Sequence, residues 1–508
     1  MKKSKVLLTL IMAAVMILTV VLPVFAADTY TITINKEEAG HKYEAYQIFL
    51  GEVSTDEETG DLVLSSITWG SGVTEAGKTA LGNAQDLADT LKTTADAEAF
   101  AKEVAPYLTS TCSKATYNAT DKNYTISDLP AGYYLIKDED NSLADEEGYT
   151  AYILKVVGNT EADPKDGETT FEKKVDDKND SNTTENELEW HDSADHDIGD
   201  AIEFKLSSTI AENYDEYETY YLSFHDTEEK GLTFDPASVK VYVDNKLITT
   251  GYEVVTECED GCTFEVIFED LKAVTSVGAG SEVVVRYQSV LNNEAVLGNK
   301  GNVNKAYAEF SNNPNDEQGG RGETEEDTVI IFTYKVIVNK VDGEMQPLPG
   351  ATFTLEKFEA AATGTVEHKG VMGNWKALST VETTPDTTFS FNGLDDGEYR
   401  LTETEAPEHY NAIAPIYFTV TAEHEVEWTM DRLDVLTSLS GDVATGEIKF
   451  TADKVTGNIG TEIVNERGVI LPETGGIGTT IFYVAGVILV IGAALLLITK
   501  KKMSSYKK

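Results

Sequence analysis

The chain has 508 residues, enough for about three domains of ordinary size. Lys and Arg together number 40 and Asp and Glu 88, so the net charge is −48, which excludes a nucleic-acid binder with its basic surface. Hydrophobic residues make up 41% and aromatic residues 9%, too many for a disordered acidic chain, and three cysteines are too few to hold three domains together.

The N-terminal end predicts secretion. Three lysines stand before residue 6, an apolar run follows from Val6 to Val21, and small residues stand at Ala26 and Ala27. This order is typical of a cleaved signal peptide. We therefore expect a signal peptide at residues 1–26 and a secreted mature chain.

Two sequence echoes indicate a tandem array of related domains. Residues 29–36 (TYTITINK) return almost unchanged as 333–340 (TYKVIVNK), and residues 129–138 (LPAGYYLIKD) resemble 394–403 (LDDGEYRLTE). Apolar and polar residues alternate along most of the chain between Gly, Asn, Asp and Pro turns, which predicts all-β sandwich domains. The Ala-rich segment 74–108 departs from this pattern and predicts a helix inserted in the first domain.

Composition predicts the boundaries between domains. Polar joints at 159–170 (NTEADPKDGETT) and 312–328 (NNPNDEQGGRGETEEDT) divide the mature chain into domains at 27–165, 166–328 and 329–470. The acidic segment 176–189 resembles a calcium loop loosely, without the spacing and glycine of an EF-hand. It is either a calcium site or a solvated loop.

The phase of the strands places polar residues on core-facing positions. Side chains two residues apart on a strand point the same way, so a lysine that continues an apolar alternation points into the core. The lysines in this position are Lys36, Lys173 and Lys340, with Lys174 as an alternative to Lys173; the acids are Asp138, Asp226 and Glu403; and each domain has an asparagine near its end, at Asn159, Asn304 and Asn465. The similar lysine-to-asparagine separations of 123, 131 and 125 residues predict that the first and last strands of each domain lie together.

A buried lysine beside a carboxyl group and an asparagine has two interpretations. Burial favours the neutral amine, which is nucleophilic, and a buried carboxylic acid can protonate the asparagine amide and pass the proton to departing ammonia. The product is an intramolecular Lys–Asn isopeptide bond. The alternative is a buried salt bridge beside an asparagine that caps a turn.

The cysteines leave two states open. Cys258 and Cys262 flank an Asp-Gly turn and can pair across a hairpin, which leaves Cys112 unmatched. A reduced set is the alternative.

The C-terminal end carries three elements in a fixed order. The pentapeptide 471–475 (LPETG) is followed by an uncharged apolar run at 481–498 and by three lysines from Lys500. This order resembles the cell-wall sorting signal of Gram-positive surface proteins, which implies that a sortase cleaves between Thr474 and Gly475. The alternative is a single-span membrane protein with a chance LPETG, and lysines after the span predict a cytoplasmic C-terminus in either case.

The third domain carries a family resemblance. Residues 348–355 (LPGATFTL), 399–410 (YRLTETEAPEHY) and Asn465 before LPETG are similar to the CnaB-type domain of Gram-positive backbone pilins. The resemblance implies an immunoglobulin-like fold, with Glu403 as the acid that promotes a Lys340–Asn465 bond. Residues 301–304 and 310–314 look like the second domain of such pilins, which implies Asp226 as the acid beside Asn304. The resemblance is weakest in the first domain.

A lysine at the first joint resembles an assembly residue. Residues 163–166 (DPKD) resemble the pilin motif, commonly Tyr-Pro-Lys-Asn, whose lysine attacks the sortase acyl-enzyme. This resemblance implies that Lys165 is the acceptor amine. The alternative is a solvated linker lysine.

Together these features predict the major, shaft-forming pilin of a sortase-assembled pilus anchored in the cell wall. The expected partners are pilus-type and housekeeping sortases, identical subunits and peptidoglycan, with minor pilins and host surface ligands beside them. A singly anchored adhesin that binds host matrix or glycan is the alternative. No Ser/His/Asp order, metal cluster or phosphate loop stands out, so we expect neither an enzyme nor a cofactor beyond autocatalytic bond formation.

Overall fold

We describe a computed structural model of the chain. It describes residues 29–505 except 58–59, 61, 145, 151, 157–158, 183–187, 317–319, 383–386, 429–434, 444–447 and 469–476. The expected signal peptide at 1–26 and the expected cleavage residues Thr474 and Gly475 lie outside the described residues.

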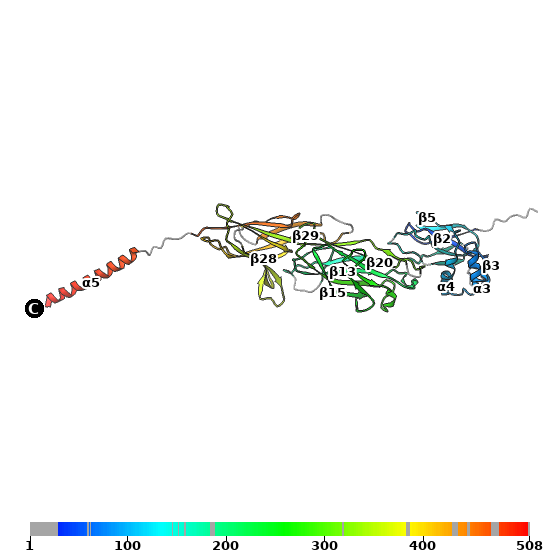
Figure 1. Ribbon diagram of the computed structural model, residues 1–508, viewed down its shortest axis with the longest axis horizontal. Helices are drawn as coiled ribbons and strands as arrows, with labels where there is room; N and C mark the ends of the chain where they lie inside the picture. The colour runs from blue at the N-terminus through cyan, green and yellow to red at the C-terminus, as the bar shows by residue number, and fades with distance from the viewer. Residues whose placement is uncertain are drawn as a thin grey trace, which may run out of the picture.

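Three β-sandwiches follow one another in chain order along the long axis of the molecule, and a single helix continues beyond the third (Figure 1). Strands hold 48% of the residues and helices 12%, which confirms the all-β prediction. Each sandwich consists of two sheets that enclose an apolar core, as alternating strands require.

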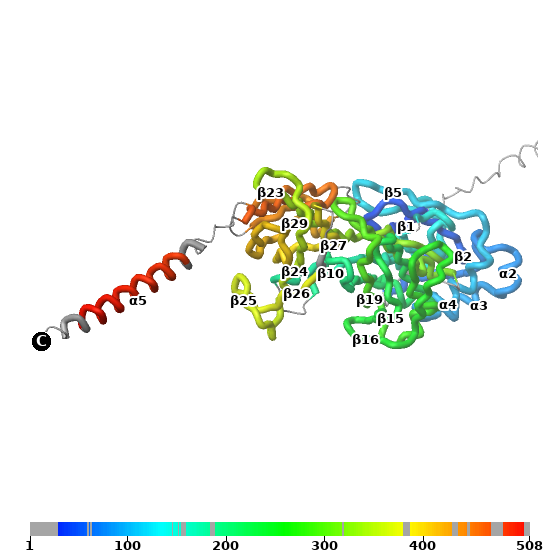
Figure 2. The backbone as a smooth tube through the Cα atoms, turned by 60° about the vertical axis from the view of Figure 1, so that its left-hand side comes forward, coloured from blue at the N-terminus to red at the C-terminus, as the bar shows by residue number. Residues whose placement is uncertain are grey.

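The first sandwich carries the helical insertion. One sheet has the order β5-β6-β1-β9, with β1 at Tyr30–Ile34, β5 at Thr116–Asn118, β6 at Asn123–Leu129 and β9 at Thr160–Ala162. The other has the order β3-β2-β7-β8, with β2 at Tyr43–Thr55, β3 at Leu62–Trp69, β7 at Gly132–Asp138, β8 at Ile153–Val156, and β4 at Ser113–Lys114 on β2. The predicted helix at 74–108 is confirmed as three short helices and a 3-10 turn on one flank (Figure 2): α2 at Glu75–Leu81, α3 at Ala84–Ala88, α4 at Thr94–Val104 and η1 at Ala105–Tyr107.

The middle sandwich has two larger sheets. One has the order β11-β10-β13-β19-β15-β16, with β10 at Thr170–Asp176, β11 at Trp190–His191, β13 at Ala201–Thr209, β15 at Leu232–Val243, β16 at Lys246–Ile248 and β19 at Glu282–Leu291. The other has the order β12-β22-β20-β14-β18-β17, with β12 at Ser193–Asp195, β14 at Leu222–Glu228, β17 at Glu253–Val255, β18 at Phe264–Phe268, β20 at Asn302–Phe310, β22 at Asp327–Phe332, and β21 at Gly322–Glu323 on β20. Two 3-10 turns, η2 at Tyr214–Glu216 and η3 at Leu271–Ala273, connect strands.

The third sandwich repeats the plan of the first without helices among its described residues. One sheet has the order β27-β23-β32-β31, with β23 at Tyr334–Asp342, β27 at Thr388–Leu394, β31 at Thr451–Asp453 and β32 at Asn458–Asn465. The other has the order β25-β26-β24-β28-β29-β30, with β24 at Thr352–Ala360, β25 at Val366–His368, β26 at Val371–Glu382, β28 at Gly397–Glu405, β29 at Ile416–His424 and β30 at Leu436–Val443.

The strand pairing contradicts one of the expected domain boundaries. The boundary after residue 328 falls inside β22, which pairs with β20 and β12 and therefore completes the middle sandwich as far as Phe332. The acidic segment before β22, which predicted a joint between domains, is a loop within this sandwich. Only Thr333 separates β22 from β23, so the second and third sandwiches are directly joined, whereas residues 163–169 separate β9 from β10.

The C-terminal helix α5 covers Ile477–Ser505. Its apolar part, Ile481–Lys501, has 21 residues, enough at about 1.5 Å per residue to cross a hydrocarbon layer of about 30 Å. None of this part is buried against the sandwiches. The sandwiches therefore do not depend on the helix for packing.

Candidate functional site

The third sandwich brings Lys340, Glu403 and Asn465 together in its core. Every second residue of β23 is buried as far as Lys340, which explains why the lysine side chain points inward. β32 runs parallel to β23, with Lys340 opposite Ile463 and Asn465 two residues further on. The Asn465 Nδ2 donates hydrogen bonds to both carboxylate oxygens of Glu403, at 2.9 and 3.0 Å.

Electrostatics in this cluster favour a reactive amine. Burial lowers the pKa of Lys340 to about 8, although the nearby charge of Glu403 acts in the opposite direction. The Lys340 Nζ donates to the Ile463 carbonyl at 2.9 Å and to the Val341 carbonyl at 3.0 Å. The buried Asn465 Oδ1 accepts no hydrogen bond from the described residues.

The middle sandwich holds a second cluster, built across its two sheets. Lys173 lies on β10 of one sheet, and Asp226 and Asn304 lie on β14 and β20 of the other. All three are fully buried. The Lys173 Nζ forms an ion pair with Asp226 Oδ2. The first strand β10 lies against both β20 and the last strand β22, as expected, but it faces them across the core instead of pairing with them as β23 pairs with β32.

Tyr287 completes the middle cluster. Its hydroxyl donates to Asp226 Oδ2 at 2.6 Å, and it accepts from the Lys173 Nζ and the Asn304 Nδ2, both at 2.9 Å. Tyr287 was not among the residues expected in the cluster. Its signal was the alternation of β19, where Tyr287 shares the buried face with Val283 and Val285.

The buried groups of the middle cluster have shifted proton affinities. Burial lowers the pKa of Lys173 despite the opposing charge of Asp226, and burial raises the pKa of Asp226 itself. Burial, with the charge of Asp226, also raises the pKa of Glu228 to about 8. The buried Oδ1 atoms of Asp226 and Asn304 have no hydrogen-bond partner among the described residues.

The alternative lysine, Lys174, faces away from this cluster. Its Nζ lies 2.6 Å from Asp192 Oδ1 and 3.5 Å from Glu172 Oε1. Alternation along β10 thus leaves Lys173 as the lysine of the core.

The first sandwich does not bring Lys36, Asp138 and Asn159 together. Thr160 lies opposite Ile32, which puts Asn159 beside Thr31 at the start of β1, where its Oδ1 accepts from the Thr31 amide at 3.1 Å. Lys36 lies beyond the end of β1, five residues away. Asp138 is paired with His41 at 2.8 Å and accepts from the Thr150 amide at 2.9 Å.

An aspartate takes the place of the asparagine in this sandwich. β1 and β9 are parallel, as β23 and β32 are, and continuing their register puts Asp166 beside Lys36 as Asn465 stands beside Lys340. The Lys36 Nζ lies 2.9 Å from Asp166 Oδ2. Burial alone would lower the pKa of Lys36, but the hydrogen bond and charge of Asp166 outweigh burial and raise it. Lys36 is therefore held as an ammonium in an ion pair.

Lys165 lies at the joint between the first and second sandwiches. Its Nζ is 2.6 Å from Glu98 Oε1 on α4 and 2.9 Å from Glu216 Oε1 on η2, so two sandwiches share its charge. Its side chain is 33% exposed. Burial alone would lower the pKa of Lys165, but the two glutamates raise it.

The cysteines and the acidic loop have structural partners. Of the two states left open for the cysteines, the structure has the disulfide between Cys258 and Cys262, and Cys112 is free. The expected calcium loop at 176–189 is described only in part. Its Asp180 lies near the buried ammonium of Lys357, which pairs with Asp197 at 2.7 Å and with Asp395 at 2.5 Å, so a lysine supplies positive charge there.

Comparisons with known proteins agree with this architecture. Residues 334–432 match a SpaA prealbumin-like fold domain, and residues 471–505 match an LPXTG cell wall anchor motif. The chain is similar in structure to the T6 backbone pilin of Streptococcus pyogenes serotype M6, with 18% identity, a TM-score of 0.54, and coverage of 87% of this chain and 98% of that one.

A second solved structure gives the same result. The full-length major pilin SpaD from Corynebacterium diphtheriae matches with 19% identity, a TM-score of 0.50, and the same coverage of 87% and 98%. The chain has the fold of the Gram-positive major pilins. Its anchor motif makes it a cell-wall-anchored surface protein.

A curated relative shares part of this sequence. The trypsin-resistant surface T6 protein of Streptococcus pyogenes serotype M6 is 24% identical over 369 residues, which are 59% of this chain. The chain spans 64% of the length of that relative.

The pH dependence of stability tests the state of Lys340. In an Asn465→Ala variant, Lys340 remains an amine whose pKa in the folded state, about 8, lies below its ordinary value of 10.5. The unfolded state then binds more protons between these values, so the free energy of unfolding should rise from pH 8 to pH 10.5. Urea unfolding at several pH values measures it. A Lys340→Met, Asn465→Ala double variant should lack this rise, and equal slopes would contradict the assignment.

Proposed function

We propose that this chain is the shaft subunit of a sortase-polymerised pilus, in which Thr474 of one subunit is joined to Lys165 of the next. Pilus-type sortase would form this bond, and housekeeping sortase would attach the finished polymer to peptidoglycan. Minor pilins and host surface ligands would be further partners. The observation that carries the proposal is the position of Lys165 at the joint between the first and second sandwiches, with the anchor motif beyond the third (Figure 1).

The separation between Lys165 and the anchor motif suits head-to-tail assembly. Two complete sandwiches lie between Lys165 and the anchor motif, so successive subunits joined through these residues would extend along one axis (Figure 1). The Lys165 side chain is partly exposed, and two glutamates hold it in one place. A freely solvated linker lysine would lack this arrangement.

The buried clusters support covalent reinforcement of the second and third sandwiches. A neutral lysine Nζ would attack the asparagine Cγ, a new C–N bond would form, and Nδ2 would leave as ammonia. Asp226 and Glu403 are within hydrogen-bonding networks of the reacting asparagines and would carry the proton to the leaving group. The expected products are Lys173–Asn304 and Lys340–Asn465 bonds.

In this proposal the first sandwich bears no tension and contains no Lys–Asn crosslink. It lies N-terminal to Lys165, outside the path of tension between the two assembly residues. Its lysine faces an aspartate in an ion pair. The geometry does not support the expected Lys36–Asn159 bond, so we propose two Lys–Asn crosslinks per subunit.

The assembly proposal predicts a covalent ladder. Cell-wall extracts probed for this chain should show boiling-resistant multimers, and Lys165→Ala should reduce them to monomer because the acceptor amine is lost. Lys102→Ala is the matched control, since Lys102 pairs with Glu218 across the same joint at 3.7 Å. An unchanged ladder in Lys165→Ala would reject the acceptor, and a wild type without multimers would favour the singly anchored adhesin.

The crosslink proposal predicts a mass deficit. After reduction of its disulfide, the secreted chain truncated after residue 468 should be lighter than its sequence by two ammonia molecules. Asp226→Ala and Glu403→Ala should each restore one, whereas Asp138→Asn should leave both missing. Intact-mass spectrometry measures this directly. A measured mass equal to that calculated from the sequence would mean that both clusters are salt bridges. A third missing ammonia would contradict the placement of Asn159.

Mechanical pulling should reveal one extensible segment. With both crosslinks in place, tension passes from Asn304 to Lys340 through 36 residues that include β22. Release of this segment adds at most roughly 120 Å, at about 3.4 Å per residue. In the wild type, single-molecule pulling of the second and third sandwiches should show no extension step greater than this length. Asp226→Ala should add a step several times longer, and long steps in the wild type would rule out the crosslinks.

A further inference from the structure

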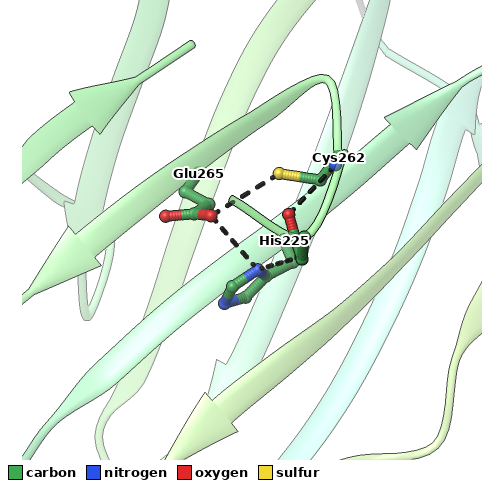
Figure 3. A group of neighbouring side chains, drawn as sticks. His225, Cys262 and Glu265 are labelled. Atoms are coloured by element: carbon green, nitrogen blue, oxygen red, sulfur yellow. Dashed lines mark hydrogen bonds and ion pairs between the residues drawn. The ribbon is translucent and has the colours of Figure 1, made fainter. Parts of the chain in front are cut away.

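A second group of polar side chains lies on the outer face of the middle sandwich. His225 on β14 stands directly opposite Glu265 on β18 in the antiparallel register, and Asp260 lies in the turn before β18. The His225 Nδ1 is 3.0 Å from Asp260 Oδ2 and 3.6 Å from Glu265 Oε1 (Figure 3). Three potential ligand atoms therefore converge, none of which belongs to the buried lysine cluster.

The histidine is fixed by its surroundings. It is only 9% exposed, its ring stacks on Tyr307 at 4.6 Å between centroids, and its Nε2 lies 2.9 Å from the Ser223 hydroxyl. Ser223 thus engages one ring nitrogen and leaves the other directed at the two carboxylates. Metal-binding histidines commonly have this arrangement, in which a second polar group orients the ring.

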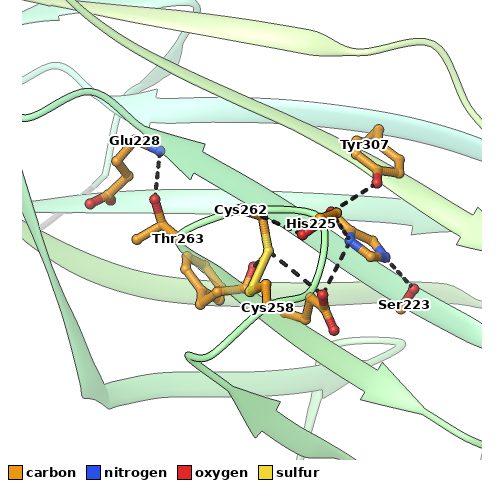
Figure 4. The surroundings of a disulfide bond; sticks show 10 residues. Ser223, His225, Glu228, Cys258, Cys262, Thr263 and Tyr307 are labelled. Carbon is orange, nitrogen blue, oxygen red and sulfur yellow. Dashed lines mark hydrogen bonds and ion pairs between the residues drawn. A yellow bond between two sulfur atoms is a disulfide. The ribbon is translucent and has the colours of Figure 1, made fainter.

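The turn that carries Asp260 is fixed as well. The Cys258–Cys262 disulfide closes a five-residue segment around it (Figure 4). Asp260 Oδ1 accepts from the Cys262 amide at 3.0 Å, and Asp260 Oδ2 accepts from the Tyr307 hydroxyl at 3.2 Å. The carboxylate is therefore held in place before any ligand binds.

The group has an excess of negative charge. Among the ion pairs of the described residues, Asp260 and Glu265 contact only His225, and no lysine or arginine reaches them. The carboxylate oxygens of Asp260 and Glu265 lie within 4.8 Å of each other, with a single imidazole beside them, so their negative charges repel. A cation between the three ligands would offset this repulsion.

We propose that His225, Asp260 and Glu265 form a binding site for a divalent cation of the zinc class. An imidazole nitrogen and two carboxylate oxygens suit Zn²⁺, whereas Ca²⁺ and Mg²⁺ prefer oxygen ligands alone. Water would complete the coordination. Cys262 Sγ lies 3.7 Å from Glu265 Oε1, so its thiolate would join the site only after reduction of the disulfide.

Equilibrium dialysis of the chain truncated after residue 468 against Zn²⁺ tests this site. The sandwiches make no packing contact with the apolar part of α5, so this chain retains its folded parts. We expect one Zn²⁺ per chain in the wild type, with Ca²⁺ and Mg²⁺ failing to displace it. His225→Gln and Glu265→Gln should each weaken binding at least about tenfold, and Ser223→Ala should weaken it about tenfold.

A matched control is available in the third sandwich. His368 lies 3.1 Å from Glu398, but Lys369 already pairs with this carboxylate at 2.6 Å, so His368→Gln should leave binding unchanged. Circular dichroism confirms that each variant is folded. The proposal would be overturned if the wild type bound no zinc, if His225→Gln and Glu265→Gln bound zinc as tightly as the wild type, or if Ca²⁺ displaced the zinc.

A spectroscopic readout separates the ligand sets. With Co²⁺ in place of Zn²⁺, the oxidised chain should show visible d–d bands that disappear in His225→Gln. A phosphine reductant should add a thiolate-to-cobalt charge-transfer band that Cys262→Ala lacks. A thiolate band in the unreduced chain would contradict the proposed nitrogen and oxygen ligands.

Discussion

Burial of a lysine amine between two β-sheets is the constraint on which the middle and third sandwiches depend. An ammonium ion without water is strongly destabilised, so a core lysine must be paired, neutral or converted into an amide. Lys173 and Lys340 are both fully buried, and each has a carboxyl group and an asparagine in its cluster. The surrounding strands are arranged so that these polar atoms meet while the rest of each core stays apolar.

The two sandwiches satisfy this constraint with different geometry. In the third, the lysine and asparagine strands are parallel neighbours in one sheet, and Glu403 reaches them from the other. In the middle, Lys173 approaches from the opposite sheet, and the Tyr287 hydroxyl joins lysine, acid and asparagine. The same three residue types therefore meet through two strand arrangements. A crosslink would join sheets in one sandwich and neighbouring strands in the other.

Alternation along regular strands made much of this predictable. It placed Lys173, Lys340, Asp226 and Glu403 on core faces, and their tertiary contacts agree with that phase. Alternation failed to find the partner of Lys36, because Asn159 lies beside Thr31 and the residue that meets Lys36 is Asp166. It also missed the group around His225, since only the fold brings the turn at 258–262 against β14. Local periodicity does not predict which residues face each other across two sheets or which turns contact a strand.

The position of Lys165 between two sandwiches links bond formation to the stiffness of a joint. Its ammonium holds Glu98 of the first sandwich and Glu216 of the second at the same point. If Lys165 is the acceptor, its conversion into an amide removes the positive charge that the two carboxylates share. They would then repel each other across the joint. Other hydrogen bonds still cross the joint, from the Tyr149 amide to the Asn312 carbonyl at 2.7 Å and from the Asn315 side chain to the Thr150 carbonyl at 2.8 Å. Each new bond between subunits would therefore remove one of several contacts that hold the first sandwich against the second.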